Sequence, residues 1–407
     1  MKRRRIHTNQ LTSDRKLAYK FILLMGIISL LGDIVYEGAR SISGPYLAFL
    51  GAGASIIGIV GGIGEFVGYA LRLVFGYFAD KTKAYWTLTI IGYGLLLSIP
   101  LLAFSNSWQI AAFLLIMERM GKAIRSPARD AILSHATKQV GRGWGFGIHE
   151  ALDQIGAIIG PLIFSAVFLL NSQYKTGFGI LIIPVVILLM LLFFARSKVP
   201  SPQKLEVSIE SDKQINSYDN KNKWSKTFWL YTFFTLLSVM GFVQYPIIAY
   251  HLNVNSIISN VWIPIFYAIA MGIDGITALI IGRTYDNIGL KTLLIIPIAT
   301  LVIPFFAFSY SKIFILFSII IWGIVMGIHE TIMRAAIADL IPLERRGTAY
   351  GIFNTVYGLS MFIGGTSIGF LYEISLSYVV TFVVIIEIIS LIFLYSLIRN
   401  VNQRANA

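Results

Sequence analysis

The chain has 407 residues, of which 56% are hydrophobic and only 13% are charged, and its mean hydropathy is +0.75. Soluble domains carry about 25% charged residues, so this composition excludes an ordinary soluble protein. Apolar stretches of about 18 residues or more recur along the whole chain, which is typical of membrane-spanning helices. We therefore expect an all-α protein that crosses the bilayer many times.

The net charge of +13 arises from 33 Lys and Arg residues against 20 Asp and Glu residues. Most of these bases lie near the termini, in a polar central stretch and in short loops on the same side of the membrane. The loops on the other side hold only Lys175 and Lys312. This asymmetry follows the positive-inside rule and predicts a multi-pass protein of the cell membrane with both termini in the cytoplasm. The bases orient the protein, so we expect no nucleic-acid partner.

The apolar runs predict twelve spans in chain order. They lie at about residues 19–49, 55–80, 85–105, 108–136, 144–171, 177–196, 226–251, 258–282, 291–310, 313–340, 347–371 and 375–398. Residues 197–225 are the long polar stretch between them and predict a cytoplasmic linker. The chain then divides into a basic tail at 1–18, six-helix bundles at 19–196 and 226–398, and a tail at 399–407.

The two halves resemble each other in sequence. "GYFADKTKAYW" closes the second span of the first half, and "GRTYDNIGLKT" closes the second span of the other half. Farther along, "RGWGFGIHEALDQIGAIIGP" aligns with "RGTAYGIFNTVYGLSMFIGG". Such internal repeats, related through an axis along the membrane normal, are a known transporter construction. We expect two pseudo-symmetric bundles.

Charge by span separates two kinds of helix. Spans 3, 6 and 9 contain no interior charge, and span 12 contains only Glu387, while spans 1, 2, 4, 5, 8 and 10 hold the rest. Charged side chains inside a membrane protein face the bundle interior. We expect these six helices to line a pathway. Its candidate residues are Asp33, Glu37, Arg40, Glu118, Arg119, Lys122, Arg125, His149, Glu150, Asp153, Asp274, His329, Glu330 and Arg334.

Helical spacing groups several of these residues. Residues 33, 37 and 40 share one face of the first span, and residues 118, 122, 125 and 129 form a cationic stripe on the fourth. The pairs Glu65–Arg72 and Glu330–Arg334 are interpreted first as structural ion pairs. The His149, Glu150 and Asp153 group has no base within a helical turn, so it is open to a role in proton or cation handling as well as to a structural one. His329 has weaker support.

"GYFADKTKAYW" resembles the loop after span 2 of the major facilitator superfamily. Gly76, Asp80 and Lys81 match the family pattern, whereas Lys83 stands at its second glycine. The second copy matches at Gly282, Asp286, Gly289 and Lys291. The resemblance implies two six-helix bundles that rock about a central site. It also implies a cytoplasmic gate in which Asp80 latches the halves, with Arg129 and Asp130 nearby.

Two further stretches resemble motifs of the same family. "RMGKAIRSPARD" is similar to the span 4 motif, whose arginine, here Arg119, is associated with proton coupling. "GAIIGP" resembles the span 5 motif of drug–proton antiporters, which implies that Gly156, Gly160 and Pro161 serve helix packing. Phe164 and Ser165 stand where that motif has a glycine pair.

These observations favour a secondary active transporter that exports a small organic solute in exchange for protons. Asp33, Glu37, Glu150 and Asp153 are the preferred titrating groups. We expect a monomer, with no cofactor and no bound metal. Two transport alternatives remain: an organic-anion carrier using the cationic stripe, and a divalent-metal carrier using the histidine and acids of span 5. A zinc-protease H-E-x-x-H is excluded, since Asp153 and Met333 occupy the position of its second histidine.

Overall fold

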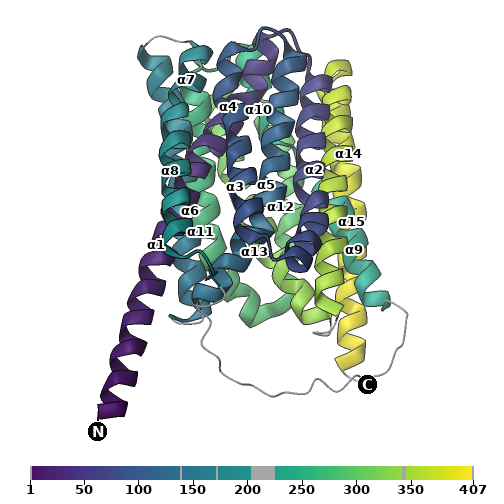
Figure 1. The fold of residues 1–407 in the computed structure, drawn as a ribbon. Coiled ribbons are helices and arrows are strands. Elements are labelled where there is room, and N and C mark those ends of the chain that lie inside the picture. Colours follow the sequence, from purple (N-terminus) through teal and green to yellow (C-terminus); the bar gives the residue numbers. More distant parts are fainter. Residues whose placement is uncertain (1, 138–139, 171–172, 203–224, 342–344, 406–407) are drawn as a thin grey trace.

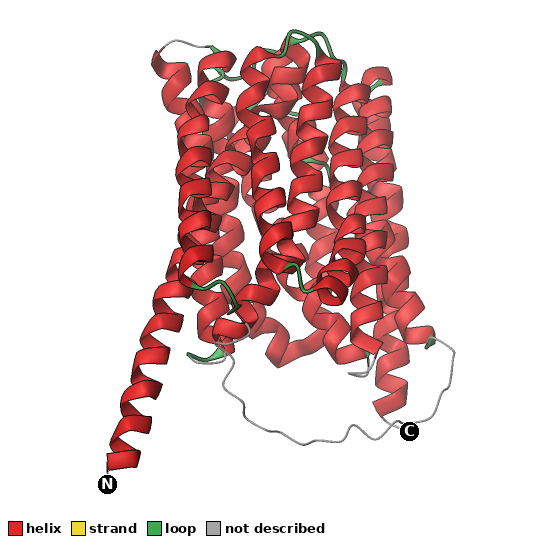
Figure 2. Cartoon of the chain, in the orientation of Figure 1, coloured by secondary structure: helices red, strands yellow, loops and turns green. Residues whose placement is uncertain are grey.

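The computed structural model describes the backbone of residues 2–137, 140–170, 173–202, 225–341 and 345–405. Within these ranges it describes all side chains except those of 2–15, 142, 143, 334, 338, 347, 402, 404 and 405. The described residues form helices and connecting loops without a strand (Figure 2). Both chain termini lie at the same end of the bundle, here called the terminal end (Figure 1). Most of the expected linker, residues 203–224, falls outside the described residues.

The first half of the chain follows the six expected spans. Its elements are α1 (Lys2–Phe49), α2 (Ala54–Thr82), α3 (Tyr85–Gly94), η1 (Leu95–Leu97), α4 (Ser98–Leu101), η2 (Leu102–Phe104), α5 (Trp108–Thr137), α6 (Arg142–Leu170), α7 (Tyr174–Ile180) and α8 (Ile182–Lys198). The elements from α3 to η2 form one crossing, and α7 with α8 forms another. Helix α1 begins well before the expected start at residue 19.

The second half repeats this plan. Its elements are α9 (Lys226–Met240), α10 (Tyr245–Val254), α11 (Trp262–Ile288), η4 (Gly289–Leu294), α12 (Ile295–Ala307), α13 (Lys312–Leu340), α14 (Arg346–Ile374) and α15 (Leu376–Ala405). Each of the twelve expected spans thus overlaps helical backbone of the described chain. Nine helical stretches of the described chain are long and apolar enough to cross a membrane, and one of them, Trp262–Ala307, covers two expected spans. The chain is an all-α polytopic membrane protein.

The seventh crossing is broken between α9 and α10, at residues 241–244. Pro246 in the first turn of α10 explains the break, because a proline cannot donate to the preceding turn and its ring clashes with the carbonyl four residues earlier. Trp322 of α13 donates from Nε1 to the carbonyl of Val243 at 2.9 Å and so satisfies one backbone group that the break exposes.

The two halves meet most closely at the end opposite the termini. A Cβ on Gly58 of α2 would overlap the carbonyl of Gly365 of α14, and one on Gly44 of α1 would overlap the carbonyl of Pro246. Glycine allows these backbones to touch. At the same end, Glu373 Oε1 of α14 accepts from the backbone N (2.9 Å) and Oγ (2.8 Å) of Ser55 in the first turn of α2. We call these contacts the seam.

Helices α1 and α6 pack along their lengths through glycines of α6. A Cβ on Gly156 would overlap the carbonyl of Leu30, and a Cβ on Gly160 would overlap that of Ile34. Pro161 lies inside α6 directly after this contact. The close crossing holds the polar face of α6 against that of α1, so the acidic residues of the two helices come within reach of α5.

Candidate functional site

A polar cavity of about 150 Å³ lies between the halves. Its walls come chiefly from α1, α2, α5, α6, α11 and α13, the six crossings that carry the interior charges. The expected pathway residues that line it are Asp33, Glu37, Arg40, Lys122, Arg125, Glu150, Asp153, Asp274 and Glu330. The structure adds residues that were not expected: Ser29, Tyr69, Arg72, Tyr93, Ser126, Gln154, Ala157, Met271 and Met326, together with Arg129 and Asp130 of the gate set.

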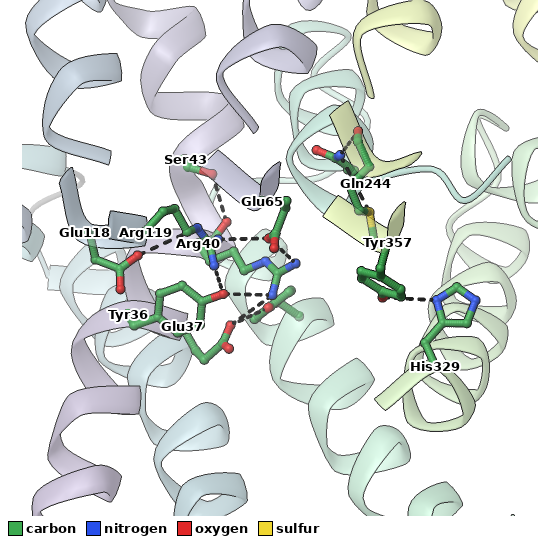
Figure 3. A network of polar contacts seen from close by, with 12 residues as sticks. Tyr36, Glu37, Arg40, Ser43, Glu65, Glu118, Arg119, Gln244, His329 and Tyr357 are labelled. Atoms are coloured by element: carbon green, nitrogen blue, oxygen red, sulfur yellow. Dashed lines mark hydrogen bonds and ion pairs between the residues drawn. The ribbon is translucent and has the colours of Figure 1, made fainter. Parts of the chain in front are cut away.

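An ionic layer closes this cavity on the side away from the termini. Glu65 Oε1 lies 3.1 Å from Arg40 Nη2 and 3.3 Å from Arg119 Nη2, so one carboxylate from α2 joins arginines from α1 and α5. Figure 3 shows these side chains converging with Tyr36 and Glu37. Glu37 Oε2 lies 3.8 Å from Arg40 Nη1. Spacing within α2 suggested Arg72 as the partner of Glu65, whereas these two partners come from other helices.

Tyr267 of α11 connects the second half to this layer. Its hydroxyl donates to Glu37 Oε2 at 2.6 Å, across the interface between the halves. Tyr267 was not among the expected pathway residues. It shares a helical i, i+4, i+7 stripe with Met271 and Asp274, and this spacing places all three on one face of α11. This hydrogen bond joins the Glu37 carboxylate of the first half directly to the second half.

The cationic stripe of α5 is largely neutralised inside the protein. Glu118 has a side chain only 2% exposed and lies 3.5 Å from Arg125 and 3.7 Å from Arg119. Lys122 differs, because no described carboxylate lies within ion-pair distance of it. Its Nζ sits 3.9 Å from the centre of the Tyr36 ring, in a cation–π contact. Lys122 is therefore the base of the stripe best placed to meet a bound anionic group.

A second ionic group surrounds Asp153 nearer the terminal end. Arg129 Nη1 lies 3.8 Å from Asp153 Oδ2 and donates to Ser29 Oγ at 2.9 Å, while its Nη2 lies 2.9 Å from Asp130. His149 Nδ1 lies 3.4 Å from Asp153 Oδ2. The acidic group of α6 thus has a base after all, contributed by α5. Spacing along α6 alone could not reveal it.

The second half presents acids to the cavity. Asp274 is 2% exposed, and its Oδ1 has no hydrogen-bond partner among the described residues. Glu330 of α13 is half-buried beside it in the same wall. Among the described side chains of the second half, these two are the charged groups that line the cavity. The side chain of Arg334, the expected partner of Glu330, lies outside the described residues.

A smaller cavity of about 40 Å³ lies on the other side of the ionic layer, toward the seam. Arg40 lines both cavities, and Gln244 from the helix break lines the smaller one. Gln244 Nε2 donates to the carbonyl of Met361 of α14 at 2.8 Å. The ionic layer therefore stands as a barrier between two polar spaces.

Both copies of the gate motif end α-helices with unusual backbone. Lys83 ends α2 with φ 54° and ψ 18°, and Gly289 ends α11 with φ 61°. Left-handed backbone explains why the family pattern has glycine at this position and identifies Lys83 as a strained substitute.

The other gate residues lie at the terminal end of the bundle. The exposed members are Asp80, Lys81, Asp286 and Lys291, and Gly76 packs toward Pro127 while Gly282 faces open space. No ion pair of Asp80 occurs among the described residues. Arg129, its expected neighbour, is instead bound to Asp130 and Asp153.

His329 lies away from the cavity wall. It is 1% exposed, packs edge-to-face on Phe242 at 5.1 Å, and its Nδ1 is 3.4 Å from the Tyr357 hydroxyl (Figure 3). Its neighbours make it a packed core residue of the second half. No group of three or more His, Asp or Glu side chains in the described part of the chain is arranged to hold a metal ion.

Comparison with known proteins gives a consistent picture. The family model of the Major Facilitator Superfamily matches residues 22–365 and 228–406. An uncharacterized protein of Mycobacterium tuberculosis is 38% identical over 384 residues, covering 93% of both chains. An uncharacterized MFS-type transporter of Methanocaldococcus jannaschii is 33% identical over 373 residues, covering 89% of this chain and 91% of the relative.

Solved structures share the fold at low sequence identity. A nucleoside transporter, NupG, superposes with a TM-score of 0.70 at 15% identity and covers 93% of this chain and 98% of its own. A bacterial homolog of the human lysosomal transporter Spinster, solved in an inward-facing and unoccupied conformation, gives 0.66 at 13% identity, covering 94% and 95%. At these identities the likeness extends to the fold alone.

Proposed function

The chain belongs to the major facilitator superfamily, and from that premise we propose that it exchanges protons for a small organic solute across the cell membrane by alternating access. The observation that carries the proposal is the cavity between the halves, whose walls bring together carboxylates from both bundles. Such groups can take up a proton in one orientation of the halves and release it in the other. Asp33, Glu37, Glu150 and Asp153 are the proposed proton carriers.

The arrangement supports an inward-facing state. The seam shuts the end opposite the termini, where backbones touch at the glycines of α1, α2 and α14. At the terminal end the cavity meets solvent, because the Asp130 side chain is 51% exposed and Glu150 is exposed while both line it. With the termini in the cytoplasm, as the distribution of bases predicts, the solute would enter from the cytoplasm, which suits export.

The charges favour a solute with a cationic group. The described cavity wall of the second half offers the carboxylates of Asp274 and Glu330 as its charged groups. An organic-anion carrier is less well supported, since Arg119 and Arg125 are already bound to Glu118. A metal carrier lacks a described ligand cluster. The cavity belongs to one chain, so we propose a monomer that works with solute, protons and lipid.

The test uses purified protein in proteoliposomes that enclose a pH-sensitive dye. Pools of organic cations, organic anions and divalent metals are added in turn under an imposed proton gradient. We expect proton flux with the cation pool, lost in Asp153→Asn and Asp274→Asn and retained in Asp212→Asn of the linker as a matched control. Flux with the anion pool that is lost in Lys122→Met would overturn the assignment of the solute. Transport of labelled solute without proton flux would overturn the coupling.

A further inference from the structure

Outside the cavity, α15 buries one carboxyl group in the core of the second half. Glu387 is 0% exposed, and neither of its carboxyl oxygens has a hydrogen-bond partner among the described residues. It continues a fully buried stripe of α15 that is otherwise Val379, Val383, Ser390, Leu394 and Leu397. A glutamate at such a position is not required for packing, since aliphatic residues fill its neighbours.

The carboxyl group faces the break between α9 and α10. A Cβ on Gly241 would overlap Glu387 Oε1 and would lie 3.0 Å from its Cδ, so the two residues are in direct contact. Ser238, one turn earlier on α9, and Ser390, one turn later on α15, also carry buried hydroxyls without described partners. Polar groups therefore collect where the helix is interrupted, and none of these residues lines either polar cavity.

Among the described residues, no base forms an ion pair with this carboxyl group. The elements packed against α15 are α9, α12, α14 and η4, and α10 follows the break. Their described titratable groups are Lys226, Tyr231, Tyr245, Tyr250, His251, Lys291, Arg346, Tyr350, Tyr357, Tyr372 and Glu373, and none makes an ion pair or hydrogen bond with Glu387. An unpaired charge at the centre of a membrane helix costs about 2.5–3.5 kcal/mol on the insertion scale. A carboxyl group in such surroundings therefore favours its neutral form, in which it has bound a proton.

We propose that Glu387 is a proton-binding site at the broken helix, separate from the cavity, and that its proton holds the break closed. The link to the rest of the molecule is α10, which begins directly after Gln244 and whose Pro246 takes part in the seam. Gln244 donates to Met361, and the Pro246 carbonyl meets Gly44 of α1. Loss of the proton places a charge against Gly241. The break must then admit water, which moves α10 away from α1 and opens the seam.

The first test is substrate-independent and uses infrared spectroscopy of the full-length protein in lipid. A protonated carboxyl group has a C=O stretching band that a carboxylate lacks. We expect such a band at neutral pH that is lost in Glu387→Gln, retained with a changed frequency in Glu387→Asp, and unchanged in Glu206→Gln of the linker. Spectra of the Glu387→Gln and parent proteins that are identical in this region would overturn the proposal.

The second test measures the seam. The chain has no cysteine, so spin labels can be attached at Phe49→Cys and Val254→Cys, the exposed last residues of α1 and α10. We expect a longer label-to-label distance to appear on raising the pH, and this response to be lost in Glu387→Gln. A response that persists unchanged in Glu387→Gln would refute the link. The site extends the transport function proposed above, yet both tests are independent of solute flux, so failure of one proposal is distinguishable from failure of the other.

Discussion

The contact between Glu373 and the first turn of α2 gives a quantitative prediction about the seam. Substituting Glu373→Gln removes the charge that caps the N-terminus of α2 and weakens two hydrogen bonds to Ser55. A carboxylate at a helix N-terminus contributes about 0.3–1 kcal/mol, and exposed charge interactions contribute about 0.2–1 kcal/mol. The Glu373 side chain is exposed, so we expect its charge and hydrogen bonds together to stabilise the closed seam by about 1 kcal/mol. That corresponds to about a fivefold change in the ratio of closed to open molecules.

The assay is the distance distribution between labels at Phe49→Cys and Val254→Cys. Glu373→Gln should raise the population of long distances about fivefold relative to the labelled parent, if that population is small. Ser55→Ala removes only the hydroxyl donor and keeps the backbone donor, so its effect should be smaller. The variant that combines Glu373→Gln with Ser55→Ala should show the same distance distribution as Glu373→Gln alone. A distance distribution unchanged in Glu373→Gln, or an effect of Ser55→Ala larger than that of Glu373→Gln, would show that the Glu373 carboxylate does not hold the seam closed.

Three further experiments test the helix packing, the backbone conformation at the gate motif and the ionic layer. Gly160→Leu should prevent close packing of α1 and α6 and lower the thermal midpoint of the purified protein, whereas Gly147→Leu, which faces open space, should leave it nearly unchanged. Gly289→Ala should destabilise by about 1–3 kcal/mol because of its backbone angles, and Lys83→Gly should be neutral or stabilising by up to about 1 kcal/mol, both measured by thermal unfolding. The opposite order of these two effects would contradict the backbone argument. Glu65→Gln should lower the free energy of unfolding because Arg40 and Arg119 lose the carboxylate that they share. Glu37 and Glu118 still lie near these arginines, so the loss should fall below about 3–5 kcal/mol, the cost of a fully broken buried pair, and a stability equal to that of the parent would contradict the importance of the shared contact.

Much of the fold follows from patterns that lie within single segments. Hydropathy located the crossings, and the distribution of charge singled out the six helices that line the cavity. The glycines of α6 were expected to serve packing, and they touch the backbone of α1 at Leu30 and Ile34. These features depend on length, charge and short-range spacing, which a sequence displays directly.

Contacts between helices could not be predicted from patterns within single segments. Spacing gives the face of a helix but not the register between two helices, so the pairing of Glu65 with Arg40 and of Asp153 with Arg129 could not be derived. The break in the seventh crossing had a signal, Pro246, yet the sequence still reads as one apolar run there. The role of Lys83 was hidden because only the backbone angles show that its position requires a glycine-like conformation.

The most direct test of proton exchange is a count of protons released when solute binds. The purified protein in weakly buffered detergent solution is mixed with the organic cation identified by the flux assay, and proton release and binding heat are recorded together. If protons are exchanged for solute, the parent protein should release protons in step with binding, with fewer protons released by Asp33→Asn and Asp153→Asn and no change in Asp212→Asn. Binding of the solute with no proton released by the parent protein would contradict it.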